Sequence, residues 1–75
     1  MDKQIIKLYL NKNVKIIYIG QELEYKVLFC KILLVTDTSV NVEYLRGNPT
    51  QKAIEIKSIK TITELRDKIN GNKTY

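Results

Sequence analysis

The chain has 75 residues, of which 44% are hydrophobic and 28% charged, and it carries a formal net charge of +5. These proportions are typical of one globular domain, residues 1–75, with a small core, and not of a disordered chain. With one cysteine and no histidine, the chain has neither an internal disulfide nor a histidine-containing metal site, so we expect no cofactor.

Residues 1–12 are predicted to be helical. Asp2 can cap a helix over residues 3–11, in which apolar side chains recur every three or four positions. Alternate residues of this segment are also apolar, so a strand that leads into a turn at 11–13 is the rival interpretation.

Residues 13–60 are predicted to form the β part of the domain. β-Branched and aromatic residues alternate with other residues in segments bounded by turn residues. Four strands can be located in this way: 14–19, 25–36, 40–45 and 53–57. Gly20 ends the first strand, a turn at 37–39 follows the second, and the clearest loop is 46–50. Consecutive short strands close most readily as a barrel, so we expect a mainly β, strongly bent antiparallel barrel of about five strands.

The strand predicted over 25–36 is apolar on both of its sides. A strand in a single open sheet would have a polar outer side. The pattern therefore predicts either a strongly bent strand or one whose second side meets another subunit.

A short C-terminal helix is predicted over residues 61–70, followed by a tail at 71–75. Thr61 and Glu64 have the spacing of a capping box, and Ile62, Leu65 and Ile69 form a helical stripe that ends before a glycine.

Positive charge is concentrated at the two ends of the sequence. Residues 1–15 carry four lysines against one acidic residue, residues 46–75 carry seven basic against three acidic residues, and the segment between them has a net charge of −2. Such a distribution suits the binding of a polyanion, although lysines also serve solubility alone.

The residue types that most often carry catalysis are missing. There is no histidine to act as a base, and Cys30 lies between apolar neighbours, which favours an inert packed thiol. The three glycines are too far apart for a phosphate-binding loop. We expect a protein that is not an enzyme.

The lone cysteine and the lysine-rich start of the chain, which has no apolar signal core, predict a cytoplasmic location. The longest apolar stretch, residues 27–35, is interrupted by Lys31 and is far shorter than the roughly 20 residues of a transmembrane helix. We expect no membrane insertion.

Three segments resemble the Sm-like (Hfq-related) family of small β-barrels, which form rings and bind RNA. Residues 8–16 are similar to the junction between that family's helix and first strand, and residues 20–23 are similar to the turn that follows there. Asp37 and Asn41 have the spacing of the family's Asp-x-x-x-Asn loop, in which the asparagine reads a base edge.

The resemblance implies a homo-oligomer whose subunits pair edge strands and bind single-stranded RNA. Asp37, Asn41, Arg46 and Lys57 would line the RNA site. Lys3, Lys7 and Lys12 would attract phosphates. The alternative for Asp37 and Asn41 is a turn that their own side chains stabilise.

Two other functions stay open from the sequence. One is a protein-interaction module, such as a regulator or an inhibitor from a mobile element, that uses an exposed edge strand or a tyrosine-rich surface. The other is a monomeric barrel that binds duplex DNA without sequence preference.

Overall fold

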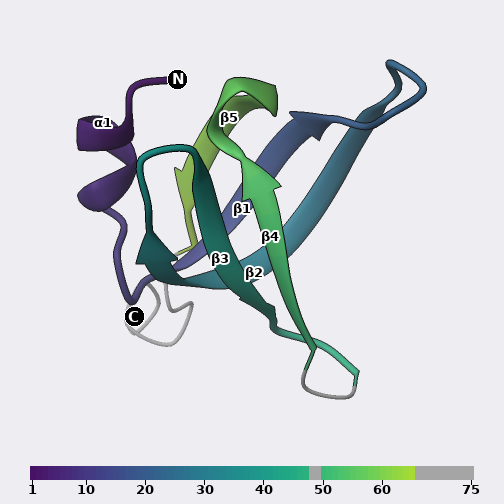
Figure 1. The fold of residues 1–75 in the computed structure, drawn as a ribbon. Coiled ribbons are helices and arrows are strands. Elements are labelled where there is room, and N and C mark those ends of the chain that lie inside the picture. The colour runs from purple at the N-terminus through teal and green to yellow at the C-terminus, as the bar shows by residue number, and fades with distance from the viewer. Residues whose placement is uncertain (48–49, 66–75) are drawn as a thin grey trace, which may run out of the picture.

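The computed structural model describes residues 1–47 and 50–65. Its elements follow one another as a short helix, four strands, a single 3₁₀ turn and a fifth strand (Figure 1). The bounds are α1 Lys3–Lys7, β1 Asn13–Ile19, β2 Tyr25–Val35, β3 Ser39–Tyr44, β4 Gln51–Glu55, η1 Ile56–Ser58 and β5 Ile59–Glu64. The predicted mainly β architecture with a short N-terminal helix is therefore confirmed.

The helix is shorter than predicted. Asp2 caps it as expected, because its carboxylate accepts a hydrogen bond of 3.0 Å from the N–H of Gln4. After Lys7 the chain continues in turns to Asn11, which has a φ of 65° and donates its N–H to the carbonyl of Ile32. Asparagine tolerates this left-handed conformation better than most residues, so Asn11 turns the chain onto the sheet before the helix can reach residue 11.

The five strands form one antiparallel sheet in the order β4-β3-β2-β1-β5. The sheet curves so that β4 and β5, which η1 connects, come to the same side of the molecule (Figure 1). These two strands do not pair with each other in the described residues, so the sheet is unclosed. Each of them has one edge along which no other described strand runs.

The prediction of a C-terminal helix is wrong for its first turn. Residues 61–64 belong to β5, which pairs with β1, and residues 66–70 of the predicted helix lie outside the described residues. Three consecutive β-branched residues, Thr61, Ile62 and Thr63, favour an extended chain where β1 still offers a free edge.

The long strand β2 contains an irregularity that accounts for part of its apolar pattern. Its register with β3 shifts between Ile32 and Leu34, so Leu33 is the extra residue of a β-bulge. The bulge reverses the alternation: Val35 lies opposite buried Val40 and packs against the core, whereas Leu34 lies opposite Asn41 and is exposed. The bulge thus accounts for apolar residues on both sides of the strand after Leu33, whereas Tyr25, Val27 and Phe29 before it are exposed on the outer side.

The core fills the concave side of the sheet and is closed on one side by the helix. It contains eleven buried hydrophobic side chains from α1, all five strands and η1: Ile6, Val14, Ile16, Tyr18, Cys30, Ile32, Val40, Val42, Ile54, Ile56 and Ile59. Across residues 1–47 and 50–65, no helix has the length and apolar character needed to cross a membrane.

Candidate nucleic-acid interface

Two segments that are far apart in the sequence meet beside the helix. The N–H of Ile56, at the start of η1, donates a hydrogen bond of 2.9 Å to the carbonyl of Thr38 in the turn between β2 and β3. A shallow pocket of about 440 Å³ lies there, lined by Met1, Asp37, Thr38, Glu55, Ile56 and Lys57. The fold thus brings Asp37 and Lys57, two of the predicted site residues, to one place.

The turn between β2 and β3 is stabilised by a threonine rather than by Asp37 or Asn41. The hydroxyl of Thr36 accepts hydrogen bonds from the N–H of Ser39 at 2.9 Å and of Thr38 at 3.3 Å, and it lies 3.1 Å from the carbonyl of Ser39. The alternative role that the sequence left for Asp37 and Asn41 therefore belongs to Thr36. The Asp37 carboxylate points away from the turn and makes its hydrogen bond elsewhere.

That carboxylate pairs with the helix. Lys3 Nζ lies 2.5 Å from Asp37 Oδ1. The hydrogen bond and charge of Lys3, with a smaller contribution from the charge of Lys7, hold the pKa of Asp37 below its usual range. Two more predicted residues, Lys3 and Lys7, are therefore close enough to Asp37 to lower its pKa. With Lys57 they place three lysines at this end of the molecule, beside the carboxylates of Asp2, Asp37 and Glu55.

The other three predicted residues do not line this pocket. Asn41 lies in the middle of β3 on the side facing away from the core, opposite Ala53 of β4. Arg46 follows the far end of β3, a strand of six residues, so roughly 17 Å of extended chain separates it from the turn that holds Asp37. Lys12 lies before β1, where its ammonium is 3.6 Å from the carboxylate of Glu64.

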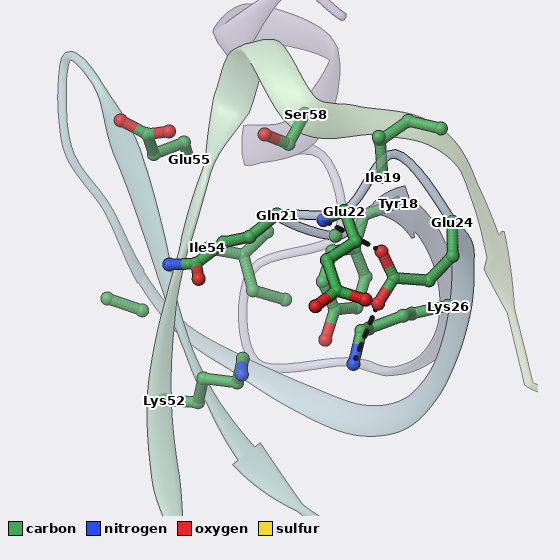
Figure 2. A pocket seen from close by; sticks show the side chains of 12 residues that line it. Tyr18, Ile19, Gln21, Glu22, Glu24, Lys26, Lys52, Ile54, Glu55 and Ser58 are labelled. Carbon is green, nitrogen blue, oxygen red and sulfur yellow. Dashed lines mark hydrogen bonds and ion pairs between the residues drawn. The ribbon is translucent and has the colours of Figure 1, made fainter.

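A second and larger pocket lies between β4 and the hairpin that joins β1 to β2 (Figure 2). Its volume is about 770 Å³, and it is open on one side. Tyr18 is 91% buried against it (9% exposed), and Lys52 Nζ lies 6.0 Å from the centroid of the Tyr18 ring. Among the described residues, no hydrogen-bond partner is found for the Tyr18 hydroxyl.

The charges around this second pocket are mixed. Glu24 and Lys26, at the start of β2, pair at 3.4 Å, and the Glu24 carboxylate also accepts the N–H of Glu22 at 3.0 Å (Figure 2). These contacts hold the pKa of Glu24 below its usual range: hydrogen bonds from the backbone are the largest cause, and Lys26 adds a smaller one. None of these residues was predicted to form a site, because only the curvature of the sheet brings β4 opposite the hairpin.

Metal and thiol chemistry find little support. Within residues 1–47 and 50–65, no group of three or more cysteine, aspartate or glutamate side chains could hold a metal ion. Cys30 is buried in the core, and burial raises the pKa of its thiol to about 11. The thiol is therefore protonated and packed, in the way that an inert cysteine is.

Comparison with known proteins gave no relative. No protein-family model matches the chain, and no curated protein and no solved structure matches it.

Proposed function

We propose that this chain is a non-enzymatic nucleic-acid-binding protein that binds single-stranded RNA as an Sm-like homo-oligomer. The observation that carries the proposal is the meeting of the β2–β3 turn with η1, which gathers Asp37, Lys57, Lys3 and Lys7 beside one pocket. The resemblance of the sequence assigns RNA contacts to these same segments, although 18 residues lie between Asp37 and the end of β4.

The chemistry of this end of the molecule suits RNA. Lys3, Lys7 and Lys57 offer three positive charges to phosphates, against Asp37 and Glu55. A carboxylate such as that of Asp37 can accept hydrogen bonds from the exposed edge of an unpaired base. The turn does not need this carboxylate, because Thr36 already stabilises the backbone there.

The edges of β4 and β5 along which no other described strand runs support assembly. Tyr44 donates its N–H to Thr50, and Ile56 donates its N–H to Thr38, each at 2.9 Å, which fixes where β3 and β4 exchange hydrogen bonds. Because the pattern alternates along an antiparallel pair, Lys52 and Ile54 bond to β3, whereas the N–H and C=O groups of Ala53 point to the free edge.

An edge of this kind is a template for another strand, and β5 offers the second one. Pairing the β4 edge of one copy with the β5 edge of the next is a head-to-tail contact. Such a contact closes into a ring when the rotation between copies permits it.

Binding of a fluorescently labelled single-stranded oligoribonucleotide, followed by anisotropy over a range of salt concentrations, tests the proposed site. Lys57→Ala should weaken binding and reduce the slope of log affinity against log salt by about one. Lys31→Ala is the matched control, because it removes the same charge from the outer side of β2. Equal binding by wild type and Lys57→Ala would remove Lys57 from the site, and no binding by the wild type would refute the proposal.

Strand addition by a different protein is the second candidate function, and the larger pocket favours it. The free edge of β4 runs along this pocket, and the hydroxyl of Tyr18, a residue that lines the pocket, has no hydrogen-bond partner among the described residues. An extended peptide bound along β4 could supply both the missing strand and a partner for this hydroxyl. Co-purification of a stoichiometric protein partner that is lost on Ala53→Pro, without RNA binding by the wild type, would favour this function over the first.

A further inference from the structure

One side of the β1–β2 hairpin carries a row of apolar side chains that do not pack in the core. These residues alternate with the buried positions of the same strands, so their side chains lie on the convex side of the sheet. We call them the outer apolar stripe: Ile17 and Ile19 of β1, Tyr25, Val27 and Phe29 of β2, and Leu45, which follows β3.

The members of the stripe are neighbours across the sheet. Ile19 lies opposite Tyr25, and Ile17 lies opposite Val27. The N–H of Leu45 donates to the carbonyl of Phe29 at 3.2 Å, which places Leu45 at the end of the row. The stripe is therefore one continuous surface rather than scattered side chains.

The stripe is large for a chain of 75 residues. Tyr25 is 71% exposed, Val27 57% and Phe29 43%, and Leu45 is exposed as well. From these fractions the exposed apolar area is on the order of 500 Å², which is at the upper end for a monomeric protein. The largest apolar patch on a protein surface is often a functional contact surface.

We propose that the outer apolar stripe is the contact surface between two copies of this chain, packed face to face about a two-fold axis. Two stripes would together bury about 1,000 Å², which is the area that a specific interface needs. Packing about a two-fold axis makes the contact self-complementary, because the same stripe is supplied by both copies. This inference does not depend on RNA binding or on pairing of the sheet edges.

The charges around the stripe favour an apolar partner over a nucleic acid. Single-stranded nucleic acids need positive charges along the row of aromatic side chains. Between Tyr25 and Phe29 the convex side of β1 and β2 carries only apolar residues, and lysines of these two strands begin at the far end of the row, with Lys15 opposite Phe29 and Lys31 beyond it. On β5 the neighbour of Ile17 is Thr61, and one exposed lysine, Lys60, lies at the bulge beside it.

Mass measurements on purified variants by light scattering test this contact. Val27→Lys places a charge in the middle of the stripe and should halve the mass of the wild-type particle. Tyr25→Lys, at a more exposed position, should do the same, so the test does not depend on one variant folding. Leu8→Lys is the matched control, because Leu8 is also 71% exposed but lies after the helix, outside the stripe, and this variant should keep the wild-type mass.

This test measures particle mass, so its outcomes can be told apart from those of the RNA-binding test. If the sheet edges do not pair, the wild type is a dimer and Val27→Lys is a monomer, which still supports the stripe as the contact. A wild type with the mass of one chain, or stripe variants with the wild-type mass, overturns the proposal. Loss of RNA binding by Val27→Lys at unchanged mass also overturns it and assigns the stripe to RNA.

Discussion

Replacing Ala53 by proline should weaken the assembly of this protein without lowering the folding stability of the single chain. The N–H of Ala53 points to the free edge of β4, so proline removes no hydrogen bond within the subunit, and edge strands tolerate proline in this orientation. In a ring that pairs β4 with a neighbour, the same change removes one hydrogen bond at every junction and leaves a carbonyl without a donor. We estimate a cost of about 2 kcal/mol per junction, or roughly 30-fold in each association constant.

The assay is light scattering over a dilution series, with urea unfolding to compare stabilities. Ala53→Pro should dissociate at higher concentration than the wild type and should unfold at a similar urea concentration when both are compared as dissociated chains. Lys52→Pro is the control for orientation: its N–H faces β3, so it should lose about 1–3 kcal/mol of folding stability. An Ala53→Pro variant that dissociates like the wild type would exclude the β4 edge from the assembly.

Three further predictions concern the single chain. Lys3 lowers the pKa of Asp37 in the folded chain. The stability that this pair contributes is therefore present above the unfolded-state pKa of Asp37 and is lost as the pH falls through the folded-state pKa. Between about pH 5 and pH 2, the urea midpoint should drop more for the wild type than for Asp37→Asn. A thiol reagent at pH 8 should modify Cys30 much more slowly in the folded than in the unfolded chain, because burial raises the pKa of the thiol to about 11, and equal rates would contradict its packing. Leu23 has a φ of 66°, so Leu23→Gly should raise the free energy of unfolding by roughly 0.5–1 kcal/mol, whereas Leu8→Gly, at a residue with a φ of −65°, should lower it.

The first three strands could be predicted from the sequence because each carries a local signal. In β1 and β3 every second residue is apolar and buried, and turn residues mark where these strands end. Beyond Leu33 the alternation of apolar residues does not predict which side chains are buried. One extra residue in a strand exchanges its two sides, and the spacing of the sequence does not reveal where that residue lies.

The fifth strand could not be predicted from its own residues. Thr61 and Glu64 have the spacing of a helix cap, and this local signal competes with β-branched residues that favour a strand. Pairing with β1 decides the outcome, and the residues of β5 carry no local signal for that partner strand.

The candidate site was predictable only in part, for a similar reason. A resemblance of short motifs placed Asp37 and Lys57 in one site, and the structure brings them to one pocket. The pair between Lys3 and Asp37 spans 34 positions of the sequence and has no local signal. Arg46 was grouped with Asp37 although the length of β3 lies between them.

The sheet edges and the outer apolar stripe would make different kinds of contact, and both can be used at once. Edge pairing lies in the plane of the sheet and joins copies head to tail, whereas the stripe faces outward from the sheet and joins two copies symmetrically. Together they would give a two-layered particle, in which Ala53→Pro leaves dimers and Val27→Lys leaves single layers. The variant with both substitutions should then have the mass of one chain. A particle that survives both substitutions would show that a surface other than these two holds it together.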